Sequence, residues 1–166
     1  MKRLKWLLVI ALVAVFAVFA LASGESETAN QGNGSADTNA PTVESEIGKY
    51  SVVIDSCRLA KDYSGKPVVI VKYIFTNVSD DESASFMFAF DETVYQDGVG
   101  LNSAYVLDDS ANYDEGNQSK EIKKGAKLDV EVAYELNDTT TDIEVEVKEL
   151  FSFNDKTLTK TFKIAE

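Results

Sequence analysis

The stretch from Pro67 to Gly98 places the strongest constraint on what this chain can fold into. Its first part, Val68–Phe75, consists of β-branched and aromatic residues that only Lys72 interrupts. After a polar turn, phenylalanines alternate with Met and Ala through Phe86–Phe90. Such runs are too short for buried helices, and a strand without a polar face is normally covered on both sides. The stretch therefore predicts a hairpin in the middle of a β-sandwich.

Alternation of apolar and polar residues indicates further strands on either side of this hairpin. The clearest is Leu128–Leu136, in which every second residue is apolar and the residues between them are mostly acidic. Other strands are predicted at Tyr50–Leu59, Leu101–Leu107, Ile143–Val147 (continued by Phe151 and Phe153) and Leu158–Ile164. With about seven or eight such segments and no amphipathic helix, the pattern predicts an all-β, immunoglobulin-like antiparallel β-sandwich.

The N-terminus has the layout of a secretory signal peptide. Basic residues within Met1–Lys5 precede the apolar run Trp6–Ala22, and Ala20-Leu21-Ala22 fits a small-residue cleavage site. As a helix, the apolar run would reach about 25 Å, short of the roughly 30 Å hydrocarbon core of a bilayer. We therefore assign residues 1–22 to a signal peptide. A retained N-terminal anchor is the alternative, and it is the one predicted route to a membrane.

The cleavage region also contains the start of a bacterial lipobox. Leu21-Ala22-Ser23 should be followed by the cysteine that carries the lipid, but Gly24 stands there. The chain is thus either a plain secreted protein or one in which this cysteine has been replaced. Residues 23–46 cannot bury enough apolar surface to fold, so they predict a disordered acidic linker. The folded domain is assigned to residues 47–166.

Charge and composition exclude several classes of function. The net charge is −12 and the pI is about 4.4, so the surface repels phosphate backbones and nucleic-acid binding is not expected. The chain has no histidine and a single cysteine, which rules out a Ser-His-Asp or Cys-His nucleophile, His-ligated zinc and an intrachain disulfide. Cys57 lies in a strand-like run and is expected to be a buried, inert thiol, with a reactive or dimer-forming thiol as the alternative.

One polar loop partly matches a calcium-binding template. Ser110, Asn112, Asp114 and Glu121 occupy positions 1, 3, 5 and 12 of a twelve-residue calcium loop. Position 1 should be Asp, however, and Gly116 comes one residue late. These four residues are the candidate metal ligands, and the alternative is a solvated acidic loop. Calcium is the one cofactor that the sequence indicates.

An acidic face on the two late strands is a second candidate site. If Leu128–Leu136 pairs with Ile143–Val147, four glutamates would lie beside one another: Glu131, Glu135, Glu144 and Glu146. Like charges directly opposite one another destabilise a sheet, so an offset register or the nearby Lys127 and Lys148 must relieve them. The face is either solvated or a docking surface for a basic partner.

Aromatic and acidic residues around the hairpin leave two more alternatives open. The aromatic set forms either a core ladder or an apolar ligand groove, and it comprises Phe86, Phe88, Phe90, Tyr95 and Tyr105. Asp91 and Glu92 could imitate the acid/base pair of a glycosidase. Acidic residues are so abundant in this chain that their spacing carries little information, and no catalytic residue is assigned.

Three segments of the chain resemble a known family. They are YSVVIDSCRLAKDYSGKPVVIVKY (Tyr50–Tyr73), FTNVSDDESASF (Phe75–Phe86) and VYQDGVGL (Val94–Leu101). They are similar to a Gram-positive secreted-lipoprotein family, known as domain of unknown function 5067, and the similarity extends over Tyr50–Glu166. This resemblance implies an immunoglobulin-like fold, akin to that of small secreted mycobacterial antigens, and it implies no activity or site residues. Gly24 departs from the lipid-bearing cysteine that such proteins often carry.

These observations lead to one functional prediction and two alternatives. We predict a secreted protein, or one on the extracytoplasmic face of the cell envelope, that is a non-catalytic binding module for an extracellular protein or cell-wall partner. The first alternative is a structural or adhesive domain whose acidic end loops bind calcium weakly. The second alternative is a hydrolase.

Overall fold

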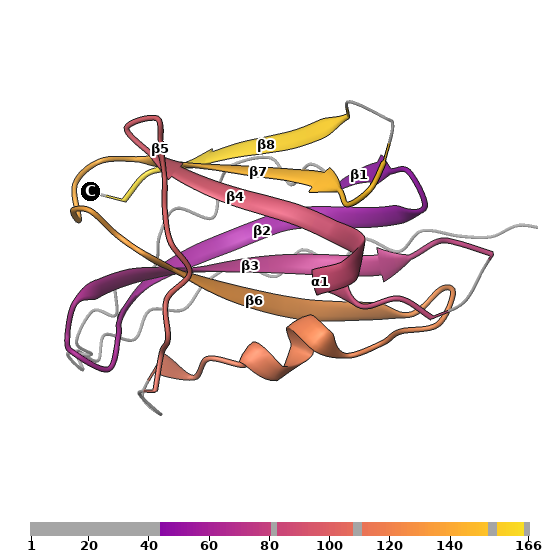
Figure 1. The fold of residues 1–166 in the computed structure, drawn as a ribbon, viewed down its shortest axis with the longest axis horizontal. Coiled ribbons are helices and arrows are strands. Elements are labelled where there is room, and N and C mark those ends of the chain that lie inside the picture. Colours follow the sequence, from indigo (N-terminus) through magenta and orange to yellow (C-terminus); the bar gives the residue numbers. More distant parts are fainter. Residues whose placement is uncertain (1–43, 81–82, 108–110, 153–155, 165–166) are drawn as a thin grey trace, which may run out of the picture. The chain divides into compact units, whose positions relative to one another are not determined.

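The computed structural model describes residues 44–80, 83–107, 111–152 and 156–164. These residues form two four-stranded antiparallel sheets, in the orders β1-β2-β3-β6 and β5-β4-β7-β8 (Figure 1). The predicted all-β, antiparallel β-sandwich is therefore confirmed. The predicted signal peptide, the lipobox region and most of the predicted linker lie outside the described residues.

The first sheet is built around β3. Its strands are β1 (Glu44–Ile47), β2 (Tyr50–Lys61), β3 (Pro67–Asn77) and β6 (Lys127–Glu135), so the sheet begins ahead of the predicted domain boundary at Ile47. β3 pairs with β2 on one side and with β6 on the other. Both faces of β3 are apolar because both are covered. Val69 and Val71 face the core, and Val68 and Ile70 on the other face are also buried.

The second sheet contains β4 (Phe90–Gln96), β5 (Val99–Gly100), β7 (Ile143–Glu149) and β8 (Thr157–Phe162). The chain passes from the first sheet to the second between β3 and β4, and again between β6 and β7. The predicted hairpin at Pro67–Gly98 is therefore wrong, because its two strands lie in different sheets. For the same reason, Leu128–Leu136 does not pair with Ile143–Val147.

The phenylalanine-rich segment before β4 is helical. In α1 (Phe86–Ala89), Phe86 and Ala89 are buried, whereas Met87 and Phe88 are 46% and 72% exposed. The N–H groups of Phe88 and Ala89 both donate to the carbonyl oxygen of Ser85, at 3.2 and 3.0 Å. The prediction of a strand over Phe86–Phe90 is thus wrong for its first four residues. A run that is apolar at every position fits a helical turn as well as a strand.

The connection from β5 to β6 runs beside the first sheet. Leu101–Leu107 makes an isolated bridge between Ser103 and Tyr134 instead of the predicted edge strand. The 3-10 helix η2 (Glu115–Ser119) follows, within the segment predicted as a polar loop. The side chain of Gln118 donates to the carbonyl oxygen of Glu131 at 2.7 Å, which holds η2 against β6.

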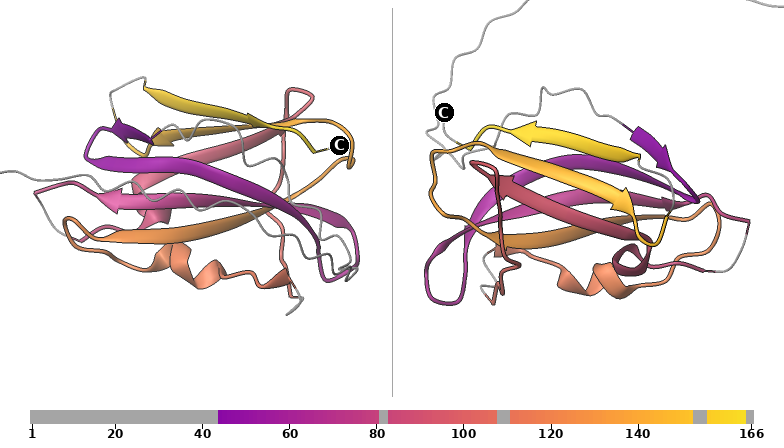
Figure 2. Two further views of the ribbon diagram at one scale, coloured as in Figure 1. Left: turned by 180° about the vertical axis from the view of Figure 1, so that it is seen from behind. Right: turned by 45° about the horizontal axis from the view of Figure 1, so that its top comes forward.

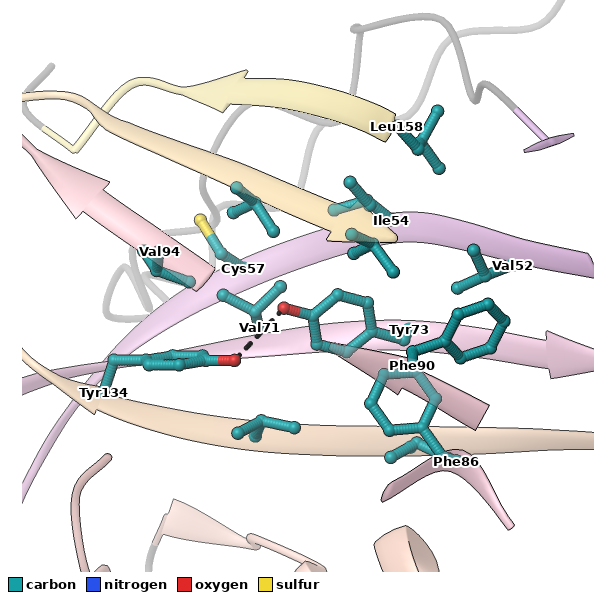
Figure 3. Close-up of a cluster of buried hydrophobic side chains, with 14 of the residues drawn as sticks. Val52, Ile54, Cys57, Val71, Tyr73, Phe86, Phe90, Val94, Tyr134 and Leu158 are labelled. Carbon is teal, nitrogen blue, oxygen red and sulfur yellow. Dashed lines mark hydrogen bonds between the residues drawn. The ribbon is translucent and has the colours of Figure 1, made fainter. Parts of the chain in front are cut away.

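Aromatic rings fill the space between the sheets near α1 (Figure 3). The ring centroid of Phe86 lies 5.0 Å from that of Tyr73 and 5.4 Å from that of Phe90. The hydroxyl groups of Tyr73 and Tyr134 are 3.4 Å apart, so each polar tip has a partner inside the core. Cys57 is free and buried, as predicted, and burial raises the pKa of its thiol to about 11.

Gln96, at the end of β4, fixes the connection between β6 and β7. Its side chain is 1% exposed and makes four hydrogen bonds to this connection. Oε1 accepts from the N–H groups of Asn137 and Asp138, and Nε2 donates to the carbonyl oxygens of Asp138 and Thr141. These hydrogen bonds join the end of β4 to the connection that leads into β7, its neighbour in the second sheet.

Candidate binding surface

The outer face of the second sheet is polar and open to solvent. Val94, Val145 and Leu158 point into the core, so the residues on either side of each point outward. The outward residues form three cross-strand rows: Asp91–Lys148–Thr157, Thr93–Glu146–Thr159 and Tyr95–Glu144–Thr161. Among the described residues, no helix or strand packs over this face (Figure 2). We call these nine residues the outer face.

The charges of the outer face are only partly paired. Lys148 Nζ lies 2.9 Å from Asp91 Oδ2, and this hydrogen bond raises the pKa of Lys148. In the part of the chain that the structure describes, Glu144 and Glu146 have no ion-pair partner. They stand opposite threonine and tyrosine side chains instead of other charges. The outer face therefore carries excess negative charge among hydroxyl groups.

An open hollow of about 470 Å³ lies at the end of the outer face where β7 ends. Asp91, Lys148 and Thr157 of the first row line it, together with Glu149, Leu150, Phe151 and Ser152 from the segment that leaves β7. The Asp91 carboxylate, an ammonium group and two hydroxyls therefore lie near an aromatic ring, whereas the Glu149 carboxylate accepts from the N–H group of Lys49. Such a combination can contact a ligand through both polar and apolar groups.

Phe151 is the most exposed large apolar side chain in the described residues. It is 90% exposed and has a positive φ of 60°. β7 ends at Glu149 and does not continue to Phe151 as predicted. Phe153 lies outside the described residues. The N–H group of Leu150 donates to the carbonyl oxygen of Ala89 at 2.9 Å, so this segment adjoins α1. Met87, Phe88 and Phe151, which we call the aromatic patch, thus project from two neighbouring segments.

The predicted calcium ligands that the structure describes lie on both sides of η2, with Asn112 and Asp114 before it and Glu121 after it. Ser110 lies outside the described residues. The carbonyl oxygen of Asn112 accepts from Arg58 at 3.2 Å, and the N–H group of Asp114 donates to Glu131 at 3.4 Å. Glu121 instead accepts from Ser83 at 2.7 Å, beyond the other end of η2. No group of three or more Asp, Glu or Cys residues in the described ranges is arranged to hold a metal ion.

The predicted acidic face does not form as one surface. Glu131 lies on β6 in the first sheet, where its carboxylate makes a two-point ion pair with Arg58, with Nη2 and Oε2 2.9 Å apart. Glu135 lies on the same strand, whereas Glu144 and Glu146 lie on β7 in the other sheet. The sheet-to-sheet crossing after β6 therefore removes the expected contact between like charges and leaves two glutamates for the outer face.

The predicted aromatic set and carboxylate pair are also divided. Phe86 and Phe90 are in the core, Tyr95 is a half-buried residue of the outer face, and Phe88 and Tyr105 are exposed. Asp91 points outward, whereas Glu92 alternates with it and points toward the core. Burial raises the pKa of Glu92 to about 7. The two neighbouring carboxyl groups therefore do not share a site.

Sequence reasoning missed the hollow and the aromatic patch. Phe151 follows an alternating strand and reads as its continuation, and nothing local indicates a positive φ for a phenylalanine. The exposure of Phe88 could have been found by testing FMFA for helical spacing, since Phe86 and Ala89 are three residues apart.

Comparisons with known proteins agree on the family and the fold. The sequence model of a family described as a domain of unknown function (DUF5067) matches residues 25–149. A search of curated proteins finds no significant match. Within residues 44–80, 83–107, 111–152 and 156–164, the structure contains no helix long and apolar enough to cross a bilayer.

Two solved structures from Bacillus subtilis have a similar fold. The candidate lipoprotein ycdA of Bacillus subtilis matches with a TM-score of 0.56 and 18% identity over 75% of this chain, which spans 39% of the length of ycdA. The yjhA protein of Bacillus subtilis matches with a TM-score of 0.50 and 9% identity, over 74% of this chain and 96% of that one. A candidate lipoprotein of Staphylococcus aureus has a TM-score of 0.48 and 21% identity, over 75% and 94%.

Proposed function

Because the chain belongs to the DUF5067 family, for which the family description gives no function, we propose a function from its geometry. The protein is an extracytoplasmic, non-catalytic binding module that contacts an extracellular protein or cell-wall partner through the outer face of the second sheet. The observation that carries this proposal is the open outer face, whose Glu144 and Glu146 lack ion-pair partners among the described residues.

The chemistry of the outer face supports binding. An antiparallel sheet can leave one face in water while the other covers the core, so the outer face can meet a partner without disturbing the fold. Its threonine and tyrosine hydroxyls can donate or accept hydrogen bonds, and its two unpaired glutamates can accept them. Opposite charge on a partner would increase both the rate and the specificity of association.

Two observations support an extracytoplasmic location. The basic segment and apolar run of residues 1–22 have the order of a signal peptide. A protein of similar fold, ycdA, is described as a candidate lipoprotein. Gly24 stands where a lipobox requires a cysteine, so we propose secretion or retention by the N-terminal segment instead of lipid attachment.

The absence of catalysis is inferred from the side chains. The chain has no histidine, and Asp91 and Glu92 point to opposite sides of the second sheet. Glu92 has a raised pKa of about 7, but its carboxyl group points toward the core instead of into the hollow.

The proposal is tested by comparing two double variants with equal loss of charge. Glu144→Gln/Glu146→Gln changes the outer face, and Glu115→Gln/Glu135→Gln changes exposed glutamates of η2 and β6. Each full-length protein is used to capture partners from envelope extracts and culture supernatants of a Gram-positive bacterium, with calcium or with chelator. We expect the first variant to lose a partner that the second retains.

Two outcomes would overturn this proposal. Equal capture by the two variants would show that the outer face is not the contact surface. Capture that requires calcium and survives Glu144→Gln/Glu146→Gln would favour the adhesive alternative. The comparison also separates specific contact from general attraction to an acidic protein, since both variants carry the same net charge.

A further inference from the structure

We propose that the aromatic patch and the hollow beside it bind an extended, lysine- or arginine-containing segment of a protein partner. This inference rests on the proposed function, because it names the partner chemistry at one end of the same surface. The steps below use the aromatic patch, the hollow and the charge of the chain.

The aromatic patch lowers the stability of the folded protein, which makes it a disadvantage unless it binds a partner. Phe151 exposes 90% of its surface and has a φ of 60°, a conformation that favours glycine or asparagine over phenylalanine. Its ring therefore adds little burial in the folded domain while its backbone is strained. Strain of this kind at an exposed aromatic residue is typical of a site that contacts something else.

The members of the aromatic patch are held together by the main chain. The hydrogen bond from Leu150 to Ala89 joins the end of β7 to the end of α1. Phe88 immediately precedes Ala89 and Phe151 immediately follows Leu150, so each lies next to one end of this hydrogen bond. Met87 adds a flexible apolar side chain that is 46% exposed. The segments that carry these three exposed apolar side chains are therefore adjacent.

The hollow supplies groups that suit a cation. Asp91 contributes a carboxylate, and the exposed ring of Phe151 can attract an ammonium or guanidinium group. Lys148 already pairs with Asp91, so an incoming cation would compete with Lys148 for that carboxylate. The unpaired Glu146 lies in the next row of the outer face and extends the negative charge beyond the hollow.

Charge decides between the possible occupants of this surface. With a net charge of −12, two copies of the chain repel one another, which disfavours a homodimer through this end. Anionic lipid and nucleic acid are disfavoured for the same reason. A cationic segment of another protein is attracted, and its apolar side chains match the aromatic patch.

The test uses the full-length protein and a synthetic peptide of alternating lysine and leucine as the probe, with affinity measured by titration calorimetry. A peptide with glutamate in place of lysine is the matched control. We expect Phe88→Ala/Phe151→Ala to weaken binding of the lysine peptide at least about tenfold, although it changes no charge. Tyr63→Ala/Tyr105→Ala removes two exposed aromatic side chains on other connections, and we expect it to bind as the unchanged protein does.

Phe151→Gly is a second variant, in which backbone strain at this position cannot prevent folding. Glycine adopts a φ of 60° without cost, so this variant is expected to fold at least as stably as the unchanged protein and still bind the probe more weakly. Unchanged affinity in both phenylalanine variants would overturn the inference, and so would equal binding of the glutamate peptide. Sedimentation showing a dimer that the phenylalanine variants lose would also overturn it, in favour of a second copy of the chain.

The design distinguishes failure of this inference from failure of the proposed function. If Glu144→Gln/Glu146→Gln abolishes capture of the natural partner while the phenylalanine variants bind the probe normally, the outer face is confirmed and the aromatic patch is excluded. If the phenylalanine variants lose the probe while Glu144→Gln/Glu146→Gln still captures the natural partner, the hollow and the aromatic patch are confirmed and the proposed role of Glu144 and Glu146 is excluded.

Discussion

The carboxylate of Glu149 lies directly against the backbone of Gly48, where a Cβ atom would come within 1.7 Å of Glu149 Oε2. Gly48 is in the turn between β1 and β2 and has a φ of +61°. Glu149 Oε1 also accepts from the N–H group of Lys49 at 3.3 Å. The end of β7, which forms one wall of the hollow, is therefore attached to the first turn of the other sheet.

Replacing Gly48 tests this attachment. Gly48→Ala should lower the free energy of unfolding by about 1–2 kcal/mol, because alanine is strained at this φ and its methyl group displaces the Glu149 carboxylate. Urea unfolding measures the change. In a Glu149→Ala background the same substitution should cost less, since only the backbone strain remains. Equal costs in the two backgrounds would show that the contact with Glu149 contributes nothing.

Gln96 should be among the polar residues most important for stability. Gln96→Ala removes four hydrogen bonds and leaves buried groups of the β6–β7 connection without partners, so we expect a loss of about 2–4 kcal/mol. Gln118→Ala is the control, because its amide donates to Tyr113 and Glu131 at a half-buried position, and it should cost about 1 kcal/mol or less. Similar urea midpoints for the two variants would contradict this ranking.

The positions of strands were predictable where one face of the strand is exposed to solvent. β6 and β7 show clean alternation because their outward residues are charged, and both were placed within a few residues of their observed bounds. Pairing was not predictable, because it depends on which connections cross between sheets. In the sequence, Gln96 resembles an ordinary turn residue. In the structure, it forms hydrogen bonds with Asn137 and Thr141, in the connection where the chain passes from β6 in one sheet to β7 in the other.

The candidate surface was predictable only in part. Glu144 and Glu146 were identified as acidic residues on one wet strand face, and this placement is correct. Their expected neighbours Glu131 and Glu135 lie in the other sheet, because strands that follow one another in sequence need not pair. The hollow depends on the positive φ of Phe151 and on the contact between Glu149 and Gly48, which are tertiary features without a local sequence signal.

Glu92 should make stability depend on pH. Burial raises its pKa from 4.5 to about 7, with Asp91 as a like charge nearby and the hydroxyls of Tyr73 and Tyr134 toward the core. The unfolded chain releases this proton at lower pH than the folded protein. The stability that protonated Glu92 gives the folded protein is therefore fully present below about pH 4.5 and is lost as the pH rises through about 7. This loss lowers the free energy of unfolding by about 3 kcal/mol.

Glu92→Gln isolates this contribution, because glutamine stays neutral at every pH. Relative to the unchanged protein, the variant should be more stable at pH 8 and similar at pH 5, as measured by urea unfolding at each pH. Glu146→Gln, on the outward side of β7, should show no such difference. Parallel pH profiles for Glu92→Gln and the unchanged protein would rule out titration of Glu92 in this range.

Phe151→Gly should stabilise the domain, although it removes a large apolar side chain. The side chain is 90% exposed, so little buried area is lost, and glycine relieves a left-handed conformation that costs other residues about 1–2 kcal/mol. Part of this gain is offset by the greater freedom of glycine in the unfolded chain, which leaves an expected increase of about 0.5–1 kcal/mol. Phe88→Gly is the matched control, because Phe88 lies in α1 and glycine should destabilise it there. A decrease in stability for Phe151→Gly would show that the ring of Phe151 packs against the domain, and the argument that its exposure serves binding would then fail.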